Sequence, residues 1–214
     1  MQYICTMDII LIEPHYIGNC SYWNVLLRAE QIVLDYKEHY VRRSYRNRAC
    51  LLGANGILRL SIPLERGKNQ HSAMHNVRIS YNERWQDLHW QSFISAYRRS
   101  PFFEYYEEEF RKLYTTKFEF LVDFNFQMMQ LIAKLLKTEL SVTFADKYYP
   151  KATFNGNDCR DFITPGIVNC ANATSYLQVF SDRFSFVPDL CVLDVIFNLG
   201  NQSKAYLMNL EVKF

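Results

Sequence analysis

Short apolar runs near the start of the chain flank a segment with helical character. Residues 7–12 form an apolar run of strand length that ends before a proline, and residues 31–36 form a second run rich in β-branched side chains. A helix is predicted between them over 21–30, with Asn19 or Ser21 as its N-cap. Strand, helix and strand in succession are typical of a βαβ unit, which predicts a partly parallel sheet.

The apolar positions that follow alternate with polar ones and indicate a hairpin. Residues 50–62 contain Asn55-Gly56, the favoured pair for a type I′ turn. Leu58 and Leu60 alternate with polar neighbours. We therefore expect an antiparallel hairpin with one polar face.

Helical spacing dominates the middle of the chain, where helices are predicted over 82–99, 102–114 and 118–136. The other predicted elements are a loop over 67–75, strands over 77–80 and 142–145, a loop over 149–166, and a helix that begins near Pro188 and ends at Gly200. There is no internal repeat and no linker rich in glycine, serine or proline. We expect one domain over 1–214 with an α/β fold: a mixed sheet, flanking helices and a helix-rich middle segment.

Composition and charge narrow the class of protein. The 214 residues are 49% hydrophobic and 16% aromatic, which excludes a disordered chain. The net charge of +2 disfavours a nucleic-acid partner, so an anion site has to be a local patch. The apolar segment 118–136 contains Glu119, Asp123 and Lys134, so we expect no membrane insertion.

The six cysteines indicate reduced thiols in a cytoplasmic protein. No two lie closer than the 11 positions between Cys159 and Cys170, and no CxxC pair occurs. We therefore expect no metal site and no cofactor. Met7 offers an alternative start site, in which case residues 1–6 would be an extension.

An arginine row is the most conspicuous polar feature. Arg42, Arg43, Arg46 and Arg48 fall within seven positions of a nearly neutral chain. If this stretch is extended, Arg42, Ser44, Arg46 and Arg48 share one face and can bind phosphate or carboxylate oxygens in pairs. The alternative is a solvated edge strand that its charge protects from aggregation.

Three other side chains are candidates for acid or base chemistry. His89 shares a predicted helix stripe with Trp85, Leu88, Ser92 and Ala96, and could act as a general base; the alternative is a core histidine satisfied by one hydrogen bond. His15 and Asp35 follow the two predicted parallel strands, where α/β sheets place ligand contacts, or they serve as turn formers. Motifs for dinucleotides, P-loops, α/β-hydrolases, zincins and calcium loops are absent from the sequence.

Several segments together resemble the WbqC-like protein family. They are Glu13-Pro14-His15-Tyr16, Tyr22-Trp23, Tyr45-Arg46-Asn47-Arg48, Leu60-Ser61-Ile62-Pro63, Trp85-Gln86-Asp87-Leu88-His89, 96–103 and 176–180. The sequence departs from the family pattern at Glu13 and at Ile17-Gly18. Members are typically encoded among bacterial surface-polysaccharide genes, so the resemblance implies a step in making or modifying an O-antigen sugar.

The resemblance implies a cytoplasmic transferase that acts on a nucleotide-activated amino sugar, by acyl or aminoacyl transfer. On this hypothesis Arg46 and Arg48 hold the pyrophosphate, and His89 and Asp35 are the catalytic residues. Other substrate-binding residues would be His15, Tyr16, Tyr45, Asn47, Trp85 and Tyr97. Arg46, Arg48 and His89 should then converge on one pocket. The alternative is a non-catalytic binding or scaffold protein of a polysaccharide assembly complex, or a nucleic-acid-binding module.

Overall fold

The computed structural model describes residues 7–65, 72–170 and 172–213. It begins with β1 (Met7–Ile12), α1 (Cys20–Arg28) and β2 (Ala29–Leu34). β1 and β2 pair in parallel, so the predicted βαβ unit is confirmed. Asn19 caps α1, because its side chain accepts a hydrogen bond from the Tyr22 N–H at 2.9 Å.

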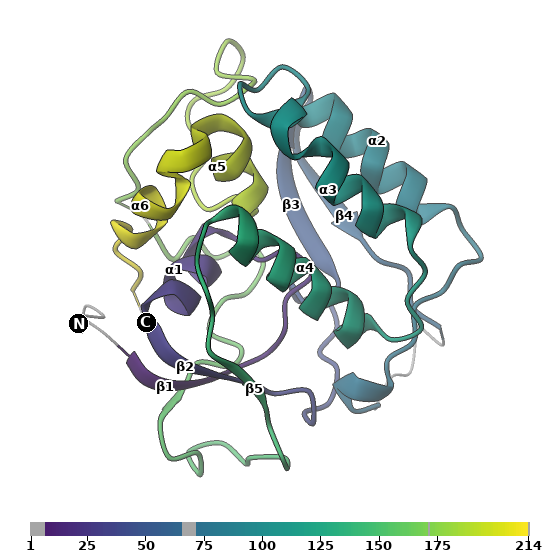
Figure 1. Cartoon of the computed structure of the whole chain (residues 1–214), viewed down its shortest axis with the longest axis vertical. Coiled ribbons are helices and arrows are strands. Elements are labelled where there is room, and N and C mark those ends of the chain that lie inside the picture. The colour runs from purple at the N-terminus through teal and green to yellow at the C-terminus, as the bar shows by residue number, and fades with distance from the viewer. Residues whose placement is uncertain (1–6, 66–71, 171, 214) are drawn as a thin grey trace.

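Two short strands complete a parallel sheet. β5 (Val142–Phe144) pairs with β2, and β6 (Asn157–Asp158) pairs with β1, which gives the order β5-β2-β1-β6. The predicted strand over 142–145 is confirmed, whereas β6 falls in the predicted loop over 149–166. Figure 1 shows this sheet at the lower left, below the helices and the hairpin. The sheet therefore presents the carboxyl ends of several strands at one edge.

β3 (Arg48–Gly53) and β4 (Gly56–Ser61) form the predicted antiparallel hairpin. Gly56 has a φ of 106°, which glycine adopts without strain, but Asn55 is not among the described residues with positive φ. The predicted type I′ turn at Asn55-Gly56 is therefore wrong, because Gly53 pairs with Gly56 and the turn consists of Ala54 and Asn55. Leu60 is buried but Leu58, nearer the turn, is 39% exposed. On β4 the predicted alternation therefore buries only Leu60, whereas β3 buries Leu51 and Leu52 near the turn.

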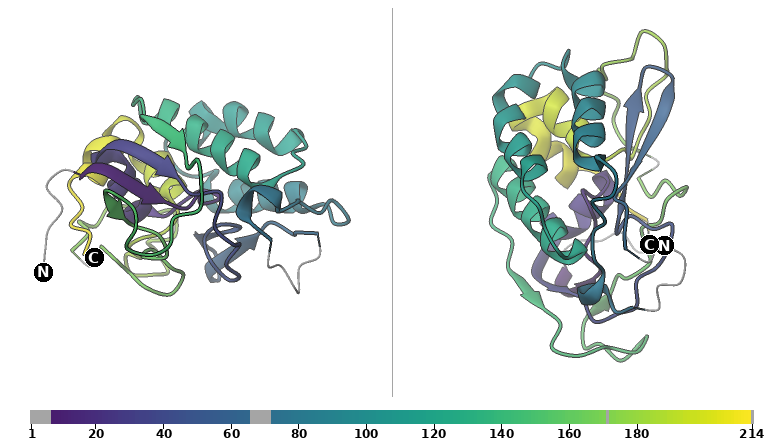
Figure 2. Two further views of the ribbon diagram at one scale, coloured as in Figure 1. Left: turned by 90° about the horizontal axis from the view of Figure 1, so that it is seen from below. Right: turned by 90° about the vertical axis from the view of Figure 1, so that its right-hand side faces the viewer.

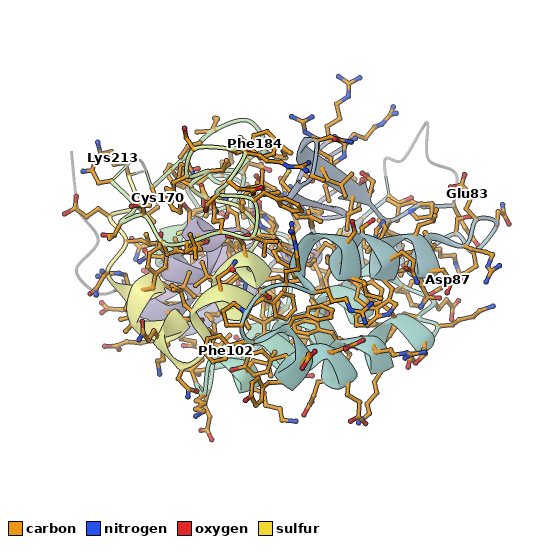
Figure 3. The ribbon with its side chains drawn as sticks, turned by 90° about the horizontal axis from the view of Figure 1, so that it is seen from above. Glu83, Asp87, Phe102, Cys170, Phe184 and Lys213 are labelled. Atoms are coloured by element: carbon orange, nitrogen blue, oxygen red, sulfur yellow. The ribbon has the colours of Figure 1, made fainter. Side chains whose placement is uncertain are left out.

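Three helices supply most of the aromatic core; the first packs on β3, the second packs on the first, and the third packs on the second. They are α2 (Trp85–Tyr97), α3 (Phe103–Thr115) and α4 (Leu121–Leu135), and the predicted helices match each of them. The right-hand view of Figure 2 shows these helices on one side and the hairpin on the other. Side chains fill the space between the layers, whereas Glu83 and Asp87 point outwards (Figure 3). The predicted helix stripe is wrong at Leu88, which is 62% exposed. The buried face of α2 includes Phe93 instead.

The C-terminal helices differ more from the expectation. α5 (Val192–Leu199) begins four residues after Pro188, where the sequence predicts its start. Its C-cap is Gly200, as predicted. Gly200 has a φ of 53°, and a Cβ there would lie 2.6 Å from the ring of Phe102. The short helices η2 (Gly200–Gln202) and α6 (Ser203–Met208) follow and were not expected.

The remaining expectations have mixed outcomes. The predicted strand over 77–80 is wrong, because Ile79 forms only an isolated bridge with Leu64. The end of the predicted loop over 67–75 contains η1 (Met74–Asn76), and residues 67–71 lie outside the described residues, as do Cys5 and the possible extension before Met7. The other five cysteines are free. Within the described ranges, the search for a helix of membrane-spanning length and apolarity finds none.

Candidate functional site

Charged side chains gather at the carboxyl edge of the parallel sheet. Glu13 follows β1, Glu38 follows β2, and Asp161 follows β6. The carboxyl ends of parallel strands meet at one edge, which is where α/β sheets form their ligand crevices. Segments that are far apart in the sequence thereby bring their carboxylates together.

Arg46 lies at the centre of these carboxylates. Its Nε donates to Glu38 Oε1 at 2.7 Å, and its Nη2 donates to Asp161 Oδ1 at 2.9 Å. Its Nη1 lies 3.7 Å from Glu13 Oε1. Arg46 is only 1% exposed. The structure therefore places this guanidinium among three carboxylates of the chain itself, where it compensates their charge.

His15 and Glu13 extend the same cluster. His15 Nε2 lies 3.1 Å from Glu13 Oε1, and the His15 ring stacks on Tyr22 with centroids 4.0 Å apart. The rings of His15 and Tyr45 lie 5.5 Å apart. The Asp161 N–H donates to Glu13 Oε2 at 3.3 Å. We call Glu13, His15, Glu38, Arg46 and Asp161 the buried charge cluster.

Burial and pairing set different pKa values for the members of this cluster. Burial works to raise the pKa of Glu13, but the charge of Arg46 and the hydrogen bond with His15 outweigh it and lower the value to about 2. Burial raises the pKa of Glu38 to about 8 against the attraction of Arg46, and Glu13 adds to the rise. Burial lowers the pKa of His15. Near neutral pH the cluster therefore holds a proton on Glu38, while Glu13 is charged.

Asp35 forms a second ion pair beside the cluster. Its Oδ2 accepts a hydrogen bond from Arg160 Nη1 at 2.7 Å, and Arg160 also pairs with Asp158. Its Oδ1 accepts the backbone N–H groups of Lys37 and Glu38, both at 3.0 Å. Asp35 is fully buried. Its observed contacts fix the turn after β2 to the segment after β6.

The arginine row is not extended as the sequence suggested. Residues 42–47 form turns and bends, and Arg43 adopts a φ of 60°. Ser44 and Arg46 are buried, whereas Arg42 and Arg43 are exposed. The predicted common face for Arg42, Ser44, Arg46 and Arg48 is therefore wrong, because Arg46 turns inwards to its carboxylates.

A pocket of about 370 Å³ is lined in part by Asn47 and Arg48, the two residues that follow Arg46 in the chain. We call it the arginine pocket; it is lined by Tyr40, Arg42, Arg43, Asn47, Arg48, Ile62, Pro63 and Leu64. Burial raises the pKa of Tyr40, and the charges of Arg48, Arg46 and Arg42 oppose the rise. The lining of this pocket includes three arginines and the amide of Asn47, and it includes no acidic side chain.

Two polar groups of the arginine pocket have no partner of their own. Arg48 forms no ion pair within the ranges that the structure describes, and its Nε is buried without a hydrogen-bond acceptor. The Asn47 Oδ1 atom is also buried without a donor, while its Nδ2 is fixed by the Ile62 carbonyl at 2.9 Å. A buried unsatisfied group of this kind carries a desolvation cost that a ligand can remove. Arg48 can thus contact a bound anion, whereas Asn47 Oδ1 can accept a hydrogen bond only from a donor group of a ligand.

His89 lies in the aromatic core. Its Nδ1 is 2.8 Å from the Tyr16 hydroxyl, which also bonds the Tyr114 hydroxyl. The ring of Trp85 meets it edge to face at 5.1 Å. Burial lowers the pKa of His89 to about 4, against a hydrogen bond with the Ser61 backbone. These contacts match the core-histidine alternative.

The structure brings together only part of the predicted site. Tyr97 is buried against Phe197 and the Cys191 thiol, and Trp85 is buried beside His89. The residues that line the arginine pocket include Arg48 but neither Arg46 nor His89. His15 and Tyr16 are neighbours in the chain, yet His15 contacts the buried charge cluster and Tyr16 contacts His89.

Sequence reasoning missed several polar residues at the sheet edge. Glu38, Asp158, Arg160 and Asp161 were not candidates, and Glu13 was noted only as a departure from a family pattern. A charge argument could have found Glu38, because a buried arginine needs nearby carboxylates and Glu38 lies only eight positions before Arg46. Asp161 gave no local signal, since it is 115 positions from its partner Arg46.

Comparison with known proteins gives one match. The model of the WbqC-like protein family matches residues 13–179, a range that contains the buried charge cluster and the arginine pocket. Neither the curated proteins nor the solved structures gave a match. Within the described part of the chain, no group of three or more histidine, cysteine, aspartate or glutamate side chains could hold a metal ion.

Proposed function

Because the chain belongs to the WbqC-like protein family, we propose that it binds a nucleotide-activated amino sugar and acts as a transferase in bacterial surface-polysaccharide synthesis. The arginine pocket receives the phosphate groups of this ligand. The observation that carries the proposal is Arg48, a cation with no carboxylate partner among the described residues and with a buried, unpartnered Nε.

The chemistry of the pocket favours phosphate over other ligands. Arginine offers planar, paired donors that match phosphate oxygens, and three arginines line one pocket. A volume of about 370 Å³ lies at the small end of the range for ligand pockets. The pocket therefore suits the diphosphate, with the sugar extending beyond it. Asn47 Oδ1 remains available to accept a hydrogen bond from a ligand hydroxyl.

Arg46 has a supporting role in this proposal. Its ion pairs hold the segment that ends in Asn47 and Arg48, and Asn125 Nδ2 fixes the Arg46 carbonyl at 2.8 Å. The buried charge cluster thus orders the backbone before the ligand arrives. Preorganised donors of this kind bind an anion without a further entropy cost.

A transfer to the sugar nitrogen requires a group that accepts its proton. Glu38 is our candidate in its deprotonated form, which becomes more populated as pH rises through its pKa of about 8. His89 is less suited, since its pKa is about 4 and its Nδ1 is occupied by Tyr16. The acyl or aminoacyl nature of the transferred group follows from the family resemblance.

A second candidate function is a binding protein without catalysis. It is favoured by the lining of the arginine pocket, which contains neither a carboxylate nor a histidine. The two functions share the phosphate contacts and differ in the need for Glu38. Glu38→Gln should preserve ligand binding in both cases and abolish transfer only in the enzyme.

A thermal-shift screen with nucleotide sugars tests the shared part of the proposal. Uridine- and thymidine-diphosphate sugars should raise the melting temperature of the wild type and of Arg59→Ala, which removes an exposed arginine on β4. These compounds should not change the melting temperature of Arg48→Ala. Equal shifts in both variants, or no shift with any compound, would contradict phosphate binding in this pocket.

A further inference from the structure

A second pocket lies between residues 174–176 and the C-terminal helices. Its volume is about 440 Å³. In Figure 1, α6 lies on the left of the molecule, whereas the chain that leaves β4 toward the arginine pocket lies at the lower right. We call this second pocket the tyrosine pocket, because Tyr176 and Tyr206 form its aromatic walls. Its lining residues from α5 onwards fall outside the range that the family model matches.

The two tyrosine rings are held in place by hydrogen bonds at their hydroxyls. The Tyr206 hydroxyl donates to the Thr174 carbonyl at 3.0 Å, and the Tyr176 hydroxyl donates to Asp194 Oδ2 at 2.5 Å. Asp194 is buried and also accepts a hydrogen bond from Gln178. The rings meet edge to face with centroids 5.1 Å apart. These rings are therefore fixed apolar surfaces.

The polar side chains around the rings are neutral and exposed. Gln202 and Asn209 supply amides, and Thr174 and Ser175 supply hydroxyls. Their side chains form no hydrogen bond within the part of the chain that the structure describes. The residues that line this pocket include no charged side chain, in contrast to the arginine pocket.

We propose that the tyrosine pocket binds a neutral sugar residue. A pyranose has an apolar C–H face that packs on an aromatic ring, and hydroxyls around its rim that both donate and accept hydrogen bonds. Amides and hydroxyls complement such a rim, whereas a phosphate or carboxylate would find no cation here. The volume suits one sugar residue with part of a second. This proposal stands independently of the phosphate site.

Saturation-transfer NMR with methyl glycosides tests the proposal. The probes are the methyl β-glycosides of glucose, galactose and N-acetylglucosamine. At least one should receive saturation from the wild type and equally from Arg48→Ala, which alters only the arginine pocket. Removing two amides in Gln202→Ala/Asn209→Ala should weaken binding by about tenfold, as expected for two lost hydrogen bonds.

A matched pair at Tyr206 separates ring contact from folding. Tyr206→Phe keeps the ring and should retain binding, whereas Tyr206→Leu removes the aromatic face and should lose it. Both variants lose the hydroxyl bond to Thr174, so that loss is common to them. Absence of saturation transfer with all three glycosides overturns the proposal, as does equal binding by Tyr206→Leu and Tyr206→Phe.

Discussion

Arg46 contacts Glu38 in the buried interior at the carboxyl edge of the sheet, with Arg46 Nε 2.7 Å and Nη2 2.6 Å from the same Glu38 oxygen. The pair joins the turn after β2 to the start of β3, eight positions further along the chain. Asn47 and Arg48 follow directly. These two contacts therefore fix the backbone that presents both residues to the arginine pocket.

Arg46→Ala should destabilise the fold strongly. It leaves Glu13 and Asp161 in the cluster without their cation, and breaking a buried pair in this way costs about 3–5 kcal/mol. Urea unfolding followed by circular dichroism measures the change. The exposed Arg59→Ala should stay within about 0.5 kcal/mol of the wild type. If the two variants unfolded alike, Arg46 would not have the structural role assigned to it.

Glu38→Gln should change how stability depends on pH. The pKa of Glu38 is about 8 in the folded chain against an ordinary 4.5, so folding retains a proton that the unfolded chain releases. This stability is fully present below the ordinary value and is lost as pH rises through about 8. Glutamine resembles the protonated form and does not titrate. The variant should therefore lose less stability than the wild type between about pH 5 and about pH 9.

The measurement for Glu38 is urea unfolding of both proteins across that pH range. Glu13 does not affect this comparison, because its pKa is lowered to about 2 in the folded chain. The stability that Glu13 contributes is fully present above pH 4.5 and is lost as pH falls toward about 2, below the range measured. Parallel stability curves for wild type and Glu38→Gln would show that the proton is not held on Glu38.

His89 should not titrate near neutral pH. Burial lowers its pKa to about 4 from an ordinary 6.5, so its neutral form stabilises the fold above the ordinary value. That contribution is lost as pH falls through about 4. The imidazole proton resonances, assigned by comparison with His89→Gln, should show no midpoint above pH 5, to within about one unit. A midpoint near the ordinary value would reinstate His89 as a candidate base.

Asp35→Asn should weaken the fold but preserve ligand binding. The change removes the charge that pairs with Arg160, although the amide oxygen can still accept the N–H groups of Lys37 and Glu38. We expect a loss of about 1–3 kcal/mol of stability. Calorimetric binding of a nucleotide sugar should remain within about threefold of wild type. Loss of binding without loss of stability would instead place Asp35 at the ligand.

Local patterns predicted most of the elements because their signals lie within a few residues. The βαβ unit follows from two apolar runs and a capped helix, and the hairpin follows from a short glycine-containing turn between two apolar segments. The helices α2, α3 and α4 show their own periodicity. By contrast, β6 has two residues, and its pairing with β1 depends on contacts between distant parts of the chain.

The candidate site was harder to predict because charge compensation acts at long range. Arg42, Arg43 and Arg48 of the arginine row line one pocket, yet Arg46 turns inwards to carboxyl groups from three separate segments. A single sequence does not show which arginine finds such partners. His89 illustrates the same limit, since its burial depends on the packing of Tyr16 and Tyr114 around it.

Binding of inorganic pyrophosphate, measured by isothermal titration calorimetry, tests the central claim most directly, because pyrophosphate is the part common to the proposed ligands. The wild type and Arg59→Ala should bind it with similar affinity, and the affinity should fall as salt rises. Arg48→Ala should bind at least about tenfold more weakly, as expected for the loss of a charged hydrogen-bond donor. Equal affinities for Arg48→Ala and Arg59→Ala, or no binding by the wild type, would contradict the account.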